Sequence, residues 1–154
     1  AGGLGKVAEA DVNEAPPDIS LVEAMQLAAD RDLIALQYTN GFAQVFQAAD
    51  KIDAAHVAGH SISSAIVRGF MEMLAEYPDS LIQRKCGEAT AQEISTRAAK
   101  VLSSSDYEQE LADFDFYLRS DGHRRNPGTT ADFIAAALFV LLREQRIQWP
   151  VSFY

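Results

Sequence analysis

The sequence predicts an all-α protein, a compact bundle of about six helices with an apolar C-terminal helix at its centre. Three observations lead to this fold class. Apolar residues recur at intervals of three and four from Ser20 onward, which is the period of helices that bury one face. The strict alternation of a half-buried strand is absent from this pattern. Helix-starting Ser and Asp residues and helix-ending Gly and Pro residues divide it into segments of helical length.

The first predicted helix follows an irregular lead-in. Residues 1–19 contain three glycines and two prolines, and we assign residues 20–154 to the helical domain. Ser20 and Glu23 have the spacing of a capping box, in which each side chain accepts a hydrogen bond from the other residue's backbone N–H. The helical period then continues through the forties, with Gly41 as an interruption or kink.

The middle of the chain predicts two long helices with a short one between them. An apolar stripe covers about residues 54–77 and ends before a proline. A cap at Asp79 or Ser80 then starts a short helix that runs to Cys86. A further long helix covers about residues 89–102.

The last third of the chain predicts two helices joined by a loop. Ser105 and Glu108 repeat the capping-box spacing and start a helix that ends near residue 119. Residues 120–128 are rich in Gly, Pro, Asn and charge, as loops are. The final helix, from 129 or 130 to about 146, is apolar on most of its surface, which is typical of a helix at the centre of a bundle.

Length and composition exclude several classes of protein. The 154 residues suffice for one domain with a buried core. The net charge of −9 disfavours a protein that binds nucleic acid through its phosphates. The longest purely apolar run, residues 133–142, is about half of a membrane span, so no membrane segment is predicted. The single cysteine, Cys86, excludes an intramolecular disulfide and fits a cytoplasmic protein.

The loop-to-helix junction at residues 126–132 is the first candidate binding segment. Backbone N–H groups at a helix start lack acceptors within the helix and carry partial positive charge, so they bind phosphate. The alternative is ordinary capping, with Thr129 as the N-cap and Asp132 at the third position. The residues predicted to surround an anion are Arg124, Arg125, Asn126, Gly128, Thr129 and Thr130.

The short helix after Asp79 is the second candidate. A carboxylate at its start suits Mg²⁺ or the removal of a proton, and Arg84 and Lys85 near its end suit a phosphate. The alternative is a capped surface helix with its cations favourably placed at the C-terminus.

Three adjacent charges, Asp30, Arg31 and Asp32, form the third candidate. Within an apolar helix they must face solvent, a partner helix or a site. Asp30 and Asp32 are two residues apart and do not share a helix face. A solvated face or an ion pair is the alternative to a binding role.

Taken together, these segments resemble the triphosphoribosyl-dephospho-coenzyme A synthase family. Residues 126–133 (NPGTTADF) are similar to that family's Pro-Gly-x-x-Ala-Asp-Leu helix start. Residues 79–87 (DSLIQRKCG) are similar to its Asp-Thr-x(4)-Arg-Gly-Gly segment, with Lys85 where the family often has arginine. The stretch 28–34, with residues 38–42, resembles a subgroup of this family that is found in archaea and in some one-carbon-metabolising bacteria.

The resemblance implies transfer of the triphosphoribosyl group of ATP to the ribose 2′-hydroxyl of dephospho-coenzyme A, with release of adenine. It implies Mg²⁺ with ATP as the cofactor. Asp79 would hold the metal or act as base, and Asp132 would cap its helix or help hold Mg²⁺. Arg84, Lys85 and the helix start at Asn126 would bind phosphate.

The chain departs from this family in length, because it resembles only the C-terminal half of its members. The N-terminal Lys-Pro-Gly and Asn-Thr-x-x-Gly motifs have no counterpart here. We therefore expect a homo- or hetero-oligomer, or a second polypeptide that supplies the N-terminal half. Two alternatives stay open: a relative that acts on another acceptor in the synthesis of a methanopterin or furan cofactor, and a non-catalytic helical half-protein.

Overall fold

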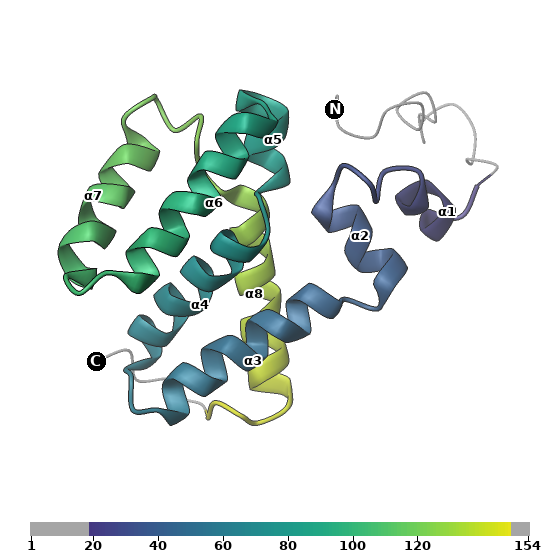
Figure 1. The fold of residues 1–154 in the computed structure, drawn as a ribbon. Helices are drawn as coiled ribbons and strands as arrows, with labels where there is room; N and C mark the ends of the chain where they lie inside the picture. Colours follow the sequence, from purple (N-terminus) through teal and green to yellow (C-terminus); the bar gives the residue numbers. More distant parts are fainter. Residues whose placement is uncertain (1–18, 149–154) are drawn as a thin grey trace. The chain divides into compact units, whose positions relative to one another are not determined.

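The computed structural model describes residues 19–148, a range that contains eight α-helices and no strand (Figure 1). The all-α prediction is confirmed, but the number of helices exceeds the six expected. Two units make up the chain, residues 1–43 and 44–154. The helices are α1 (Leu21–Gln26), α2 (Leu33–Asn40), α3 (Ala43–Val57), α4 (Ile62–Glu76), α5 (Ser80–Cys86), α6 (Glu88–Ser103), α7 (Tyr107–Arg119) and α8 (Gly128–Arg143).

The first unit contains α1 and α2, which pack against each other. The predicted capping box starts α1, because the Glu23 carboxylate accepts from the Ser20 N–H at 2.7 Å and the Ser20 hydroxyl accepts from the Glu23 N–H. The expected continuous helix is wrong, since Asp32 caps a new helix after a turn. Gly41 adopts the left-handed conformation, with φ 71°, and ends α2 instead of kinking it.

The second unit is built around α4 and α6, which lie side by side (Figure 1). Helix α7 packs on α6, and α5 contacts both α6 and α8. Gly69 of α4 allows α3 to approach closely, because a Cβ atom there would lie 2.6 Å from Ile52 Cγ1. The central apolar cluster consists of Met71, Leu74, Ile82, Ala91, Ile94, Ala98, Val101, Phe114 and Leu118.

Two predicted helix boundaries in this unit are wrong. The helix expected over 54–77 is the end of α3 and all of α4, because the chain turns at Gly59, with φ 100°, and Ser61 caps α4. The expected capping box at Ser105 is also absent, since Asp106 occupies the N-cap position of α7 without a side-chain hydrogen bond. The short helix from Ser80 to Cys86 is confirmed.

Helix α8 buries one face and exposes the other. Phe133, Ala137 and Leu141 are buried, but Phe139 is 65% exposed. The expectation that this helix lies at the centre of a bundle is therefore unconfirmed. The helix ends before the predicted residue 146, because the chain turns after Arg143 and Arg146 binds the Asp50 and Asp53 carboxylates of α3, each at 2.9 Å.

Some sequence predictions lie at the edge of the described residues or beyond it. The irregular lead-in assigned to residues 1–19 lies outside the described residues, apart from Ile19. Across residues 19–148, every helix is too short or too polar to cross a lipid bilayer.

Candidate functional site

The candidate site is centred on the start of α5. Helix α4 ends before Pro78, and Asp79 occupies the N-cap position of α5 with an extended backbone. The Asp79 Oδ1 atom accepts hydrogen bonds from the backbone N–H groups of Leu81 and Ile82, at 2.9 and 3.1 Å. The Asp79 side chain is completely buried. The capping role considered for this residue is therefore present in the structure.

The same carboxylate also caps α8, which begins about fifty residues further along the chain. Its Oδ2 atom accepts from the Thr130 N–H at 2.8 Å and from the Thr130 hydroxyl at 2.9 Å. Thr129 makes a second link, since its hydroxyl lies 3.0 Å from the Ser80 hydroxyl. One buried carboxylate thus joins two helix N-termini, whose partial positive charges offset its negative charge.

Gly128 allows these two helix starts to meet. A Cβ atom at Gly128 would lie 2.5 Å from Leu81 Cδ2, so the close approach that glycine permits here is to α5. The N-cap position of α8 is Pro127, which has no side-chain cap. The alternative of ordinary capping, with Thr129 as the N-cap and Asp132 at the third position, is wrong, because Asp79 supplies the cap from the start of α5.

These contacts bear on the metal-binding role predicted for Asp79. A carboxylate has about four lone-pair positions, and hydrogen bonds from Leu81, Ile82 and Thr130 use those of Asp79. Mg²⁺ needs carboxylate oxygens with open lone pairs, so Asp79 does not fit a metal ion in this geometry. Between residues 19 and 148, no three His, Cys, Asp or Glu side chains gather as a metal site would require.

The cations predicted to bind phosphate lie beside this junction. Arg84 and Lys85 are exposed at the C-terminal end of α5. Arg124, in the loop before α8, donates from Nη2 to the Lys85 carbonyl oxygen at 3.3 Å. The Arg124 carbonyl oxygen accepts from the Cys86 thiol at 3.5 Å. These two contacts attach the loop to the end of α5.

Arg125 is held by contacts that the sequence analysis missed. Its Nε atom lies 2.9 Å from Asp121 Oδ2, and its Nη2 atom donates to the Ser120 hydroxyl at 2.9 Å. Its guanidinium lies over the Tyr117 ring, 3.9 Å from the ring centroid, and Arg97 of α6 lies 4.1 Å from the same centroid. In such cation–π contacts the ring face attracts the guanidinium electrostatically. The spacing of Asp121 and Arg125, four residues apart, is the one sequence signal for this arrangement.

Asp121 organises the loop through its carboxylate. Its Oδ1 atom accepts from the backbone N–H groups of Arg124 and Arg125, at 3.0 and 3.3 Å. Burial acts to raise the pKa of the Asp121 carboxyl, but these hydrogen bonds and the Arg125 charge outweigh burial and lower the pKa below its ordinary value. The carboxylate is therefore ionised at neutral pH, and the loop folds around it.

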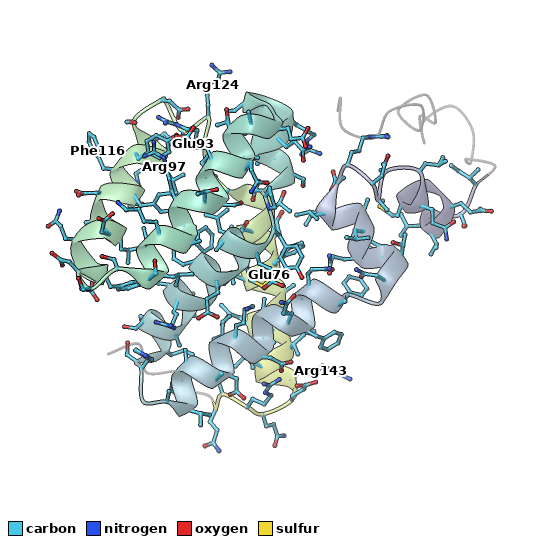
Figure 2. The ribbon with its side chains drawn as sticks, viewed as in Figure 1. Glu76, Glu93, Arg97, Phe116, Arg124 and Arg143 are labelled. Carbon is cyan, nitrogen blue, oxygen red and sulfur yellow. The ribbon has the colours of Figure 1, made fainter. Side chains whose placement is uncertain are left out.

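A cavity of about 330 Å³ opens on this side of the loop. Figure 2 shows Glu93 and Arg97 of α6 at the same end of the unit as Arg124. Within the lining, Glu93 and Asp121 balance Arg124 and Arg125, and Arg97, which contacts Glu93 at 2.7 Å without lining the cavity, adds one positive charge beside it. The lining residues are Cys86, Thr90, Glu93, Tyr117, Asp121, Arg124 and Arg125.

Two other predicted residues lie near the start of α8. Asn126 has an exposed side chain, and its carbonyl oxygen accepts from the Gly128 N–H at 2.9 Å. Asp132 is exposed on the second turn of α8. Asp132 is thus the predicted catalytic carboxylate that solvent reaches, whereas Asp79 is shielded from it.

The acidic triplet lies in the other unit. The Asp32 Oδ1 atom accepts from the N–H groups of Ile34 and Ala35, at 2.9 and 3.3 Å, and Asp32 is buried. Asp30 and Arg31 form an exposed ion pair with an N–O distance of 3.8 Å. The structure therefore shows the ion pair that was the alternative to a binding role, together with a helix cap at Asp32 that was not predicted.

Comparison with known proteins completes this description. The sequence model of the CitG family, ATP:dephospho-CoA triphosphoribosyl transferase, matches residues 1–151. A solved structure from Archaeoglobus fulgidus, assigned as a triphosphoribosyl-dephospho-CoA synthase, is similar with a TM-score of 0.71 and 30% identity. The similarity covers 84% of this chain and 54% of that protein, so this chain spans about half of its length. No protein with a curated description matches significantly. From its match over residues 1–151 and its shared all-helical fold, the chain belongs to the ATP:dephospho-CoA triphosphoribosyl transferase family.

Proposed function

We propose that this chain takes part in the transfer of the triphosphoribosyl group of ATP to dephospho-coenzyme A. The observation that carries the proposal is the family match over residues 1–151. In this reaction the bond between ribose C1′ of ATP and adenine N9 breaks, and adenine leaves with the bonding electrons and takes up a proton. The 2′-oxygen of dephospho-coenzyme A loses its proton and bonds to C1′. The transition state resembles an oxocarbenium ion, as in other glycosidic cleavages.

The triphosphate of ATP would bind at the cavity beside the loop. The guanidinium groups of Arg124 and Arg125 in its wall, with Arg97 beside it, favour a polyanion. Arg84 and Lys85 lie exposed at the end of α5, where Arg124 contacts the backbone, and they extend the positive region. This local charge explains how a chain with a net charge of −9 would attract ATP.

The carboxylates predicted as catalytic would divide their tasks. Asp132 is exposed and would accept the proton of the attacking hydroxyl. Asp79 would act as a positioning residue, because its hydrogen bonds hold the starts of α5 and α8 together. Thr129 and Thr130 would serve the same purpose, and Asn126 would supply a side-chain donor from the loop.

Magnesium would enter with the substrate. ATP carries Mg²⁺ on its phosphate oxygens and water, which does not require a dedicated cage of protein carboxylates. This placement agrees with the hydrogen bonds to both carboxylate oxygens of Asp79, which leave that side chain unsuited to bind a metal ion.

The rest of the family's fold would complete the active site. The chain spans about half of the similar Archaeoglobus fulgidus protein, and a two-substrate reaction needs more lining than one loop provides. We propose that a homo- or hetero-oligomer or a further polypeptide segment supplies this part, with ATP and dephospho-coenzyme A as the small-molecule partners. We place the activity in the cytoplasm, where ATP is abundant and one free thiol, Cys86, stays reduced.

Calorimetry with Mg²⁺-ATP, alone and with dephospho-coenzyme A, tests this function together with chromatography of released adenine. The Arg124→Gln variant should bind ATP about 10-fold or more weakly, since it loses a charge-assisted hydrogen bond. Arg143→Gln is the matched control, because Arg143 is exposed at the opposite end of the unit from Arg124 (Figure 2). If ATP neither binds nor loses adenine, even when a polypeptide with the rest of the family's fold is added, the proposed function is wrong.

A further inference from the structure

A second depression lies between α4 and α7 and is not used by the function proposed above. Its volume is about 490 Å³, and its wall is mostly apolar, with the carboxylates Glu108 and Asp115 also in the lining. Phe70 and Met71 of α4 form one side, and Leu111, Phe114 and Leu118 of α7 form the other. The sequence analysis assigned no binding role to these residues.

This apolar groove continues into a polar end beside the loop. A neighbouring cavity of about 330 Å³ shares Phe70, Asp115 and Leu118 with the groove and adds Arg119, His123, Asn126 and Pro127. Arg119 offsets the Asp115 charge through a 2.9 Å ion pair. The Asp115 charge is thus neutralised at the polar end, where the His123 ring and the Asn126 amide are available to hydrogen-bond a ligand. The whole depression is amphiphilic along its length.

The loop after α7 separates this depression from the arginine cavity. Asp121, Arg124 and Arg125 line the arginine cavity, whereas His123 and Asn126 line the polar end of the groove. Different residues of one short loop thus line the two cavities. A group-transfer reaction needs two ligands held next to each other, and this arrangement provides two neighbouring sites of different chemistry.

We infer that the groove between α4 and α7 binds the uncharged pantetheine arm of the acceptor, with the nucleotide end of the acceptor toward His123 and Asn126. This inference rests on the proposed function for the identity of the acceptor. A pantetheine arm is a long uncharged chain with methyl groups and amides, and it ends at a phosphate on the nucleotide side. The arm becomes polar at its phosphate end, just as the depression is apolar between α4 and α7 and polar beside the loop. The volumes of the groove and of its polar end both lie in the range of small-molecule pockets, about 300–1,000 Å³.

The test uses the whole chain and titrates pantetheine, dephospho-coenzyme A and Mg²⁺-ATP separately. Ala112 is exposed on α7 and lines the groove, so Ala112→Trp fills it from a position that tolerates a large side chain. Ala99→Trp on α6 is the matched control, since Ala99 is exposed and outside the groove. We expect Ala112→Trp to weaken pantetheine and dephospho-coenzyme A roughly 10-fold or more by steric exclusion. ATP affinity should stay unchanged, and the control should match the original chain.

The outcomes separate this inference from the function on which it rests. Pantetheine binding that Ala112→Trp abolishes supports the groove, even if no adenine is released and the proposed function fails. Adenine release with an unchanged KM for dephospho-coenzyme A in Ala112→Trp overturns the groove and leaves the function standing. Absence of pantetheine binding to the original chain also overturns it. So does a change in oligomeric state on Ala112→Trp, which would mean that a protein surface occupies the groove.

Discussion

Replacing Asp79 by asparagine tests whether one carboxylate holds the two helix starts together. Asparagine keeps the shape but exchanges one acceptor oxygen for an NH₂ donor. If its oxygen stays on Leu81 and Ile82, the NH₂ group faces the Thr130 N–H, which is buried and then lacks an acceptor. A buried unsatisfied donor costs about 1–3 kcal/mol, and each lost bond to a charged group about 1.5–3 kcal/mol. Removing a buried charge recovers part of this cost, so we expect a net loss of about 2–4 kcal/mol.

Denaturant-induced unfolding measures this loss, and two further variants make it specific. Thr130→Val removes only the hydroxyl bond to Asp79 and should cost about 1 kcal/mol. The double variant should lose less than the sum of the two single losses, because both act on one network. Asp132→Asn is the control, since Asp132 is exposed and should change stability by less than about 0.5 kcal/mol. Equal small effects for Asp79→Asn and Asp132→Asn would refute the double cap.

Three other predictions concern the same junction and loop. Gly128→Ala should destabilise the fold by no more than about 1 kcal/mol, because the new Cβ atom meets only the Cδ2 end of the half-buried Leu81 side chain, which can change rotamer. The loss should disappear in a Leu81→Ala background, and additive losses in unfolding experiments would contradict this packing. Folding lowers the pKa of the Asp121 carboxyl from its ordinary value of 3.8, so its contribution to stability is present above pH 3.8 and is lost as the pH falls through the pKa of the folded state. An NMR titration of the folded protein that gives Asp121 a pKa of 3.8 or higher would contradict this. Tyr117→Leu removes the ring beneath Arg125 and should weaken ATP binding, measured by calorimetry, about fivefold. An unchanged affinity for ATP would show that the ring does not orient Arg125 for the ligand.

Local signals in the sequence predicted the helical class and several helix ends correctly. The capping box predicted for Ser20 and Glu23 is present in the structure, and the helix after Asp79 ends at Gly87 as expected. These features depend on residues three to eight positions apart, so neighbouring side chains and backbone suffice to determine them. Helix boundaries were predicted wrongly where two local signals conflict. At Asp32 the apolar period favours a continuous helix, but the Asp32 carboxylate caps a new one.

The site was predicted less completely, because its contacts join segments far apart in the chain. Residues 79–87 and 126–133 were selected from their motifs, and the structure brings the starts of these two segments together through Asp79 and Thr130. Their individual contacts were not predictable: spacing alone cannot show that Asp79 caps a helix about fifty residues later, or that Arg97 and Arg125 share the Tyr117 ring.

By itself, then, the sequence determined that this chain forms amphipathic helices, where several of them start, and which family its motifs resemble. Helix period and capping are short-range properties that a single sequence displays. Only the tertiary structure decided that the Asp79 carboxylate is buried between α5 and α8, and that the loop after α7 lies between an arginine cavity and an apolar groove. Burial and cavity shape depend on which helices pack together, and that packing is the sum of many weak contacts between residues distant in sequence.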